Sequence, residues 1–403
     1  MNLDRLYAYL YALSLASFYA SEAGIFGSVG NNMRWPFVTI LAIATLVMLM
    51  RHKLHLPWIA LAPVYVFFCY LLLTLLWTDN FLLTVTKLLL YTPVVLLFFI
   101  GGSLLSTTQL QRPNPYWVMA PLYVLLLASS FLSYLTGGGV GGLFSGLTHN
   151  PNSLAAMLVF TSPWIVVAIQ QTPVGRKKRL LWVAASAGLV FLLLTHSRTS
   201  IVMAIALISP VFWISKGTRK AMLAYALLMV VALAYGINPE VFGEINQNLV
   251  KKSNDSILSS RAGQMETSLE KAREGGVLGV GFGLSAGMSE YWTFGNFSGD
   301  YSREKGSSQL AVIEECGIVG FLFYLLLIGG ICLGTFRWGR LASVTPEGRL
   351  LFVLLLGFFV GATLHSTFEA WFLSPGMETS SFWAMVGISF GALYRTAVMA
   401  PQV

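Results

Sequence analysis

The sequence predicts an all-α protein that crosses a membrane many times, and three observations predict this class. Hydrophobic residues make up 56% of the 403 residues, charged residues only 10%, and the mean hydropathy is +0.71. Soluble domains carry about 25% charged residues, so this chain cannot cover itself with polar surface. The apolar residues are also grouped in runs close to the length of about 20 residues that spans a bilayer. Finally, one long polar stretch, residues 238–308, separates these runs into two groups.

The apolar runs predict about twelve transmembrane helices. Nine lie within residues 1–237 and three within residues 309–403, with the stretch 238–308 as a large extracytoplasmic loop between them. The first run lacks a small-residue cleavage site and is followed by many more, so we expect a retained helix rather than a signal peptide. The predicted spans are residues 6–26, 35–50, 56–77, 81–105, 116–135, 154–169, 180–194, 201–214, 222–236, 318–336, 350–372 and 381–398.

The positions of the basic residues predict the orientation. Cytoplasmic loops of membrane proteins are enriched in Lys and Arg. With a cytoplasmic N-terminus, the short outer loops contain only Arg34 and Arg198, both termini lie inside, and residues 238–308 lie outside. The same orientation explains the net charge of +8 without nucleic acid as a partner. The inner basic residues are Arg5, Arg51, Lys53, Arg112, Arg176, Lys177, Lys178, Arg179, Lys216, Arg219, Lys220, Arg337, Arg340, Arg349 and Arg395.

The large loop is predicted to contain a helix followed by a glycine-rich turn. Ser259 or Ser260 can cap the helix, apolar residues follow at helical spacing to Ala272, and Gly275 can end it. The run from Gly279 to Gly283 is similar to phosphate-binding glycine loops. No strand precedes it and no βαβ unit is present, so a tight turn is the better interpretation.

Four cations are candidate anion ligands. Arg198 lies at the outer junction of two spans, where an arginine opposes the usual charge bias, and Arg261 lies near the start of the loop helix. Lys305 precedes the chain's return to the membrane, and Lys87 lies one or two turns inside a span. The alternatives are an arginine that reaches the interface from a helix end, a solvated surface arginine and an anchor for lipid headgroups.

Carboxylates and histidines at the outer ends of the spans are candidates for the chemistry. His365 and Glu369 are four residues apart and are expected to share a helix face, either as a base and its partner or as a structural pair. Glu314 and Glu315 can be helix-start residues or catalysts. His149 and Asn152 precede a span, where they can contact an acceptor or, with Ser153, start the helix. The three cysteines have no metal-ligand spacing, and we expect neither a metal site nor a cofactor.

These features together resemble the O-antigen ligase and Wzy-type O-antigen polymerase family. The matching motifs are FSGLTHNPNSLA at 144–155, THSRT at 195–199, the loop helix from Ser260 and Arg261 with LGVGFG at 278–283, and ECGIVG at 315–320. Each motif is short, but their order and the single large loop agree with the family. The resemblance covers approximately residues 137–394.

The resemblance implies a polytopic glycosyltransferase of the GT-C type, without a metal. It would move an oligosaccharide from undecaprenyl pyrophosphate to an acceptor at the outer face of the bacterial inner membrane. Arg198 and Arg261 would bind the donor pyrophosphate, with Lys305 and Lys87 beside them. Partners would be the lipid bilayer, a glycan or lipid A-core acceptor and a chain-length regulator.

One departure from the family pattern concerns the acceptor. Ligases of this family usually carry a histidine shortly before the first glycine of the motif at 315–320, whereas residues 304–310 contain none. Glu304, Lys305, His365 or Glu369 would take its place. This favours an exopolysaccharide or O-antigen polymerase over the alternative, an O-antigen ligase that uses lipid A-core. A transporter for lipid-linked glycans is the third hypothesis, which the clustering of charges at the outer helix ends disfavours.

Overall fold

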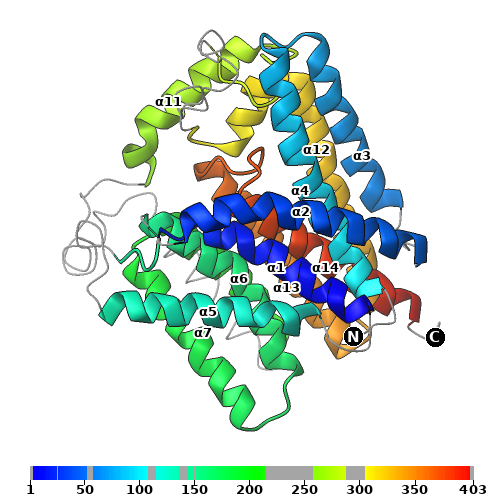
Figure 1. Cartoon of the computed structure of the whole chain (residues 1–403), viewed down its shortest axis with the longest axis vertical. Helices are drawn as coiled ribbons and strands as arrows, with labels where there is room; N and C mark the ends of the chain where they lie inside the picture. The colour runs from blue at the N-terminus through cyan, green and yellow to red at the C-terminus, as the bar shows by residue number, and fades with distance from the viewer. Residues whose placement is uncertain are drawn as a thin grey trace.

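The computed structural model is mainly helical in the residues that it describes, which are 3–24, 26–51, 58–107, 115–135, 144–148, 150–214, 257–286 and 305–399 (Figure 1). Within these ranges no strand is formed, and an isolated antiparallel bridge joins Ala23 to Thr148. The elements are α1 (Leu3–Glu22), α2 (Gly27–Arg51), α3 (Trp58–Leu73), the 3-10 turn η1 (Thr74–Leu76), α4 (Phe81–Thr107), α5 (Pro115–Leu135), α6 (Pro151–Gln171), α7 (Arg176–Leu194), α8 (Arg198–Ile214), α11 (Ile257–Gly275), α12 (Ser308–Ala342), α13 (Pro346–Phe368) and α14 (Met377–Met399).

Six of the described helices are long and apolar enough to cross a membrane, namely α2, α4, α5, α6, α12 and α13. Shorter apolar segments lie in α3 with η1 and in α8. Large apolar side chains such as Ile43 and Leu46 on α2 and Leu326 on α12 are more than half exposed. Lipid covers such side chains, and a helix satisfies its own backbone groups there, so the molecule is a multi-pass membrane protein.

The predicted spans coincide in position with helices of the structure, but the number of twelve spans is not confirmed. Each predicted span overlaps a helix except 222–236, which lies outside the described residues. The predicted loop helix is α11, and it ends at Gly275 as expected. The predicted cap is wrong, because α11 begins at Ile257 and places Ser259 and Ser260 inside the helix. The cap of α6 also differs: the Asn150 side chain accepts from the backbone N–H of Asn152, with Pro151 as the first helical residue.

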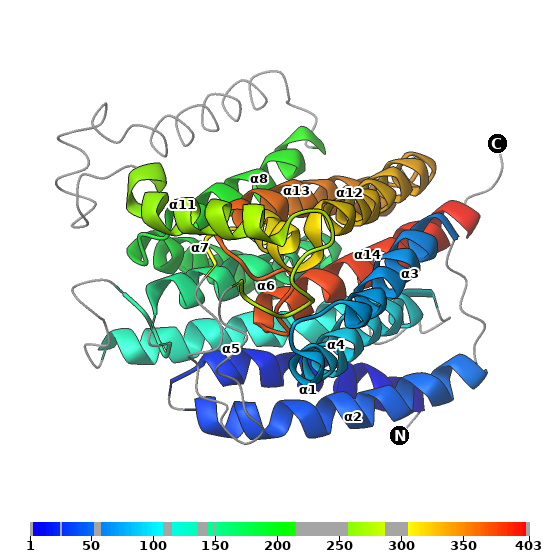
Figure 2. The same cartoon turned by 90° about the horizontal axis from the view of Figure 1, so that it is seen from above.

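The helices pack closely around a core of aromatic side chains and small residues. α14 lies against α4, α8 against α13, and α12 against both α3 and α11. At the α4–α14 contact, a Cβ on Gly387 would lie 2.3 Å from the carbonyl oxygen of Phe99, and the Ser103 hydroxyl donates to the Gly387 carbonyl at 3.0 Å. Glycine and serine allow such close approach of two helices in lipid. Figure 2 shows that α1 begins and α14 ends at the same side of the bundle.

A break in α12 positions the functional region. Gly317 has φ 70° and ψ −175°, which interrupts the helical hydrogen bonds around it. Residues 276–286, here called the glycine segment, supply the missing partners. The N–H groups of Val280 and Gly281 donate to the carbonyls of Glu314 and Glu315, at 3.1 and 3.0 Å. In return, two N–H groups that follow the break donate to carbonyls of the glycine segment at 3.1 Å each.

Only glycine fits at the break, because a Cβ on Gly317 would lie 2.2 Å from the carbonyl oxygen of Val277. Aromatic side chains fix the joint from outside: the Tyr70 hydroxyl donates to the Cys316 carbonyl at 2.6 Å, and the Trp77 indole N–H donates to the Leu278 carbonyl at 3.0 Å. The glycine run is therefore a structural turn against α12, in agreement with the interpretation made from its sequence context.

Candidate functional site

A polar cavity of about 370 Å³ lies where several helix ends meet. Its walls come from the end of α1, from α4, from the start of α6, from the glycine segment, from the start of α12 and from the α13–α14 connection. Seven of the lining side chains can carry charge. These residues are Glu22, Lys87, Lys305, Glu315, His365, Glu369 and Glu378.

Six of the residues chosen from the sequence line this cavity: Lys87, Asn152, Lys305, Glu315, His365 and Glu369. They come from α4, α6, α12, α13 and the segments next to α12 and α13, so the fold brings together positions that are far apart in the chain. The other candidates are placed differently. Arg198 is the first residue of α8, and the Arg261 backbone lies in α11. His149, Glu304 and the side chain of Arg261 lie outside what the structure describes.

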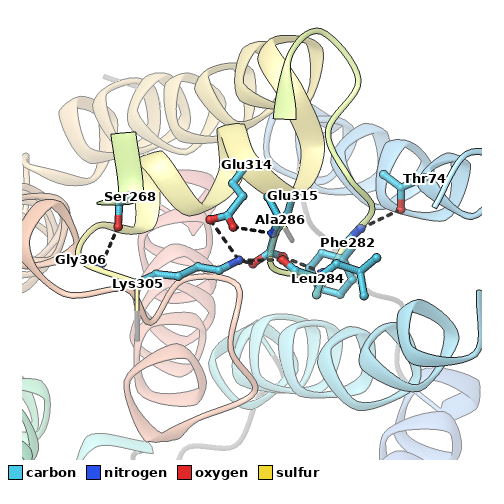
Figure 3. Close-up of polar contacts among 10 residues, drawn as sticks. Thr74, Ser268, Phe282, Leu284, Ala286, Lys305, Gly306, Glu314 and Glu315 are labelled. Carbon is cyan, nitrogen blue, oxygen red and sulfur yellow. Dashed lines mark hydrogen bonds and ion pairs between the residues drawn. The ribbon is translucent and has the colours of Figure 1, made fainter. Parts of the chain in front are cut away.

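One wall is a network of charges and backbone groups, here called the clasp, formed by residues 283–286, Lys305, Glu314 and Glu315 (Figure 3). Lys305 Nζ donates to Glu315 Oε1 at 2.5 Å and to the Leu284 carbonyl at 2.9 Å, and lies 3.6 Å from Glu314 Oε2. The remaining carboxylate oxygens accept backbone N–H groups, from Gly283 to Glu315 at 2.7 Å and from Ala286 to Glu314 at 2.9 Å.

The clasp is buried, since Glu314 is 0% and Glu315 5% exposed. Buried carboxylates require a cation and hydrogen-bond donors, and Lys305 with two backbone N–H groups supplies both. Lys305, predicted as an anion ligand, is thus held by two carboxylates. Neither Glu314 nor Glu315 lies at the start of α12, and Glu314 does not line the cavity. Both carboxylates attach the glycine segment to α12.

Lys87 approaches the same wall from α4. A Cβ on Gly283 would lie 2.5 Å from Lys87 Cγ, so the glycine leaves room for the lysine stem. Gly283 also has a φ of 79°, which other residues rarely adopt. The stem of Lys87 therefore packs against the glycine segment, and the amino group of Lys305 donates a hydrogen bond to the same segment.

His365 is a buried link between helices. The Trp371 indole, which can only donate, gives its N–H to His365 Nδ1 at 3.0 Å. In the neutral ring the proton is then on Nε2, which faces Ser200 Oγ at 3.4 Å. Ser200 Oγ also accepts from Ser197 Oγ at 3.2 Å. This chain of contacts connects the start of α8, where Arg198 lies, to the cavity wall.

The expected helix face shared by His365 and Glu369 is not formed. α13 ends at Phe368, and Glu369 has an extended backbone with φ −141° and ψ 127°. The cause is a turn held by Ser308, whose hydroxyl donates to the Glu369 carbonyl at 2.9 Å and accepts the N–H of Trp371 at 3.1 Å. Both side chains nevertheless line the cavity.

One comparison with known proteins finds a match. Residues 183–325 match the model of a family described as O-antigen ligase, so this part of the chain is similar to that family. No curated protein matches the sequence. The matched residues include Arg198, α11, the glycine segment and the clasp, whereas Lys87, His365 and Glu369 lie outside them.

The cavity is also lined by carboxylates that the sequence did not single out. Glu22 ends α1 and Glu378 lies in the first turn of α14, and both line the cavity with Glu369. We call Glu22, Glu369 and Glu378 the carboxylate wall. Burial, with smaller contributions from the charges of Glu22 and Glu369, raises the pKa of Glu378 to about 7. In the sequence, Glu378 is only an acidic residue before an apolar run.

Metal ligation gains no support from the described side chains. Among them, no group of three or more His, Cys, Asp and Glu residues is arranged to hold a metal ion. Among the side chains that line the cavity, Lys87 and Lys305 are therefore the groups that could bind an anion.

Proposed function

We propose that this membrane protein is a glycosyltransferase that extends a glycan with an oligosaccharide carried by undecaprenyl pyrophosphate. The observation that carries the proposal is the polar cavity, which is lined by two lysines and by the carboxylate wall, together with the match of residues 183–325 to the O-antigen ligase family. Lysines and arginines suit a pyrophosphate, and a carboxylate suits the proton of an acceptor hydroxyl.

The proposed reaction is a displacement at the anomeric carbon of the donor sugar. The acceptor hydroxyl oxygen forms a bond to this carbon while the bond to the pyrophosphate oxygen breaks, and undecaprenyl pyrophosphate leaves with the electron pair. Glu369 takes the proton of the hydroxyl. Arg198 and Arg261, together with Lys87 and Lys305, stabilise the charge on the leaving group, so no metal is required. Asn152 and His149 contact the acceptor, and Glu304 and His365 are further candidates on the acceptor side.

The leading form of the proposal is a polymerase for exopolysaccharide or O-antigen. The stretch 304–310 contains no histidine, and Lys305 within it is engaged in the clasp. The second form is a ligase that transfers the glycan to lipid A-core, which the description of the matched family favours. Transport alone is the weakest form, because the charged groups gather at one cavity formed by helix ends.

We place the protein in the bacterial inner membrane with about twelve spans, both termini in the cytoplasm and the cavity facing outward. The distribution of Lys and Arg supports this orientation, as does the position of the start of α1 and the end of α14 at one side of the bundle (Figure 2). The chain would act within the bilayer next to a chain-length regulator, without nucleic acid.

Transfer by the purified protein tests the proposal. The protein in nanodiscs is given an undecaprenyl-pyrophosphate oligosaccharide with chelator, and the products are separated by mass. Growth of the lipid-linked glycan by whole repeats supports the polymerase, and labelling of added lipid A-core supports the ligase. Loss of transfer with chelator, restored by a divalent cation, would contradict the metal-free mechanism, and no transfer to either acceptor would contradict the proposal itself.

A further inference from the structure

Ser285 is a buried hydroxyl that lines the cavity without a hydrogen-bond partner. Its side chain is 3% exposed, and its Oγ has no partner among the residues that the structure describes. Other hydroxyls share this property, namely those of Ser106, Ser130 and Thr335, but they do not line the cavity. A buried hydroxyl without a partner is unfavourable, so its presence at a cavity wall calls for a ligand.

The surroundings of Ser285 hold its backbone in place from both sides. The Gly283 N–H donates to Glu315, the Leu284 carbonyl accepts from Lys305, and the Ala286 N–H donates to Glu314 (Figure 3). Every neighbour of Ser285 in the clasp is thus fixed by a hydrogen bond. The side chain of Ser285 is the part of this segment that remains available, and it faces the cavity.

The neighbouring charges indicate which ligand atom it meets. Lys305 Nζ lies 2.9 Å from the carbonyl oxygen of the preceding residue, and the stem of Lys87 packs on Gly283, two residues away. Two lysines therefore contact the segment that carries the hydroxyl, and one of them, Lys305, is also paired with Glu314 and Glu315. A hydroxyl donor on a segment next to lysines suits an anionic oxygen, to which hydrogen bonds are stronger than to neutral acceptors.

We propose that Ser285 donates a hydrogen bond to a phosphate oxygen of the donor's pyrophosphate, and that the clasp serves to hold it there. This inference rests on the proposed function for its choice of ligand. It gives the clasp a second role besides fastening the glycine segment to α12, because the clasp would hold a binding group in place on a segment that has no regular secondary structure.

The experiment compares three variants. Ser285→Ala removes the hydroxyl, Ser285→Thr keeps it, and Ser130→Ala removes a buried hydroxyl that also has no partner but lies away from the cavity on α5. Binding of undecaprenyl pyrophosphate and of inorganic pyrophosphate to the protein in nanodiscs is measured without any transfer reaction, together with the melting temperature of each variant.

We expect Ser285→Ala to bind both pyrophosphates about 10-fold more weakly, as for one lost hydrogen bond to a charged group. Its melting temperature should match or exceed that of the parent, because the lost hydroxyl had no partner. Ser285→Thr should retain binding, and Ser130→Ala should leave it unchanged.

Parental affinity in Ser285→Ala would overturn the inference, and so would a lowered melting temperature with weaker binding, since it would make the hydroxyl structural. Failure of the parent to bind either pyrophosphate would also overturn it. Failure of the parent to transfer glycan, with binding intact, would instead contradict the proposed function.

Discussion

The two groups of carboxylates at the cavity have opposite surroundings. In the clasp, Glu314 and Glu315 face Lys305 and backbone N–H groups. In the carboxylate wall, burial and, to a smaller extent, the like charges of Glu22 and Glu369 raise the pKa of Glu378. A carboxylate paired with a lysine and with N–H groups has its oxygens occupied by these contacts, whereas a buried carboxylate beside other carboxylates binds a proton more readily. The first group therefore suits a structural role and the second suits proton transfer.

Glu369→Gln should produce the largest effect and tests the chemical side of this comparison. An amide cannot accept the acceptor's proton, so transfer should fall about 100- to 10,000-fold. Binding of undecaprenyl pyrophosphate should stay at the parental level. Glu347→Gln, in the first turn of α13 and at the end of this helix away from Glu369, is the matched control. Near-parental turnover in Glu369→Gln would remove this residue from the mechanism and direct attention to Glu378.

Arg198→Ala and Arg261→Ala should each reduce transfer about 30- to 1,000-fold, which corresponds to about 2–4 kcal/mol of lost charge stabilisation. Lysine should restore little of the rate, because it cannot make the two-pronged contact of a guanidinium group. The measurement is initial rate at equal protein levels. If both alanine variants stay within a few-fold of the parent, the anion site consists of other cations, and Lys87 becomes the first to examine.

Lys305→Met tests the structural side. It leaves two buried carboxylates without their cation, which costs about 3 kcal/mol in comparable buried pairs. The melting temperature in detergent should fall clearly, and adding Glu315→Gln should recover a large part of the loss. If Lys305 served only to bind the donor, the second substitution would restore no stability. Equal losses in the single and the double variant would mean that the clasp does not stabilise the fold.

The sequence predicted the helices and part of the cavity because both depend on local patterns. The length of the apolar runs located α4, α6 and α13, and the glycines indicated a turn. Lys87, Lys305 and Glu369 were recognisable because charge near an apolar run is costly. Their spacing of four residues did not predict that His365 and Glu369 lie on different local structures. Helix α13 ends between them because Ser308, which is distant in the chain, bonds to the backbone of Glu369 and Trp371.

Glu22, Glu378 and Ser285 depend on tertiary contacts that no local pattern contains. Glu22 and Glu378 come from opposite ends of the chain, and the contact of α1 with α14 joins these helices in the bundle. Serine is an ordinary residue in a glycine-rich turn, and the lack of a partner for Ser285 is a property of the folded wall. Glu22, Glu378 and Ser285 could therefore be recognised as parts of the cavity only from the folded structure.

The smallest expected effect concerns pH and the carboxylate wall. Glu378 lies in the first turn of α14, before its apolar part, and burial beside Glu22 and Glu369 raises its pKa to about 7 from the ordinary value of about 4.5. Between these two values the folded protein binds more protons than the unfolded chain. The contribution of this group to stability is therefore lost progressively as pH rises from about 4.5 to about 7, and stays lost above that.

Glu378→Gln removes this dependence. At pH 8 the variant should be more stable than the parent by about 1–2 kcal/mol, a value reduced for the partial exposure of the side chain, and the difference should vanish near pH 4.5. Melting temperatures of both proteins across this range measure it. Glu266→Gln, an exposed carboxylate on α11, removes a solvated charge and should leave the parental profile in place. A parent and a Glu378→Gln variant with parallel profiles would mean that Glu378 meets a compensating cation, and the contrast between the two groups of carboxylates would then be lost.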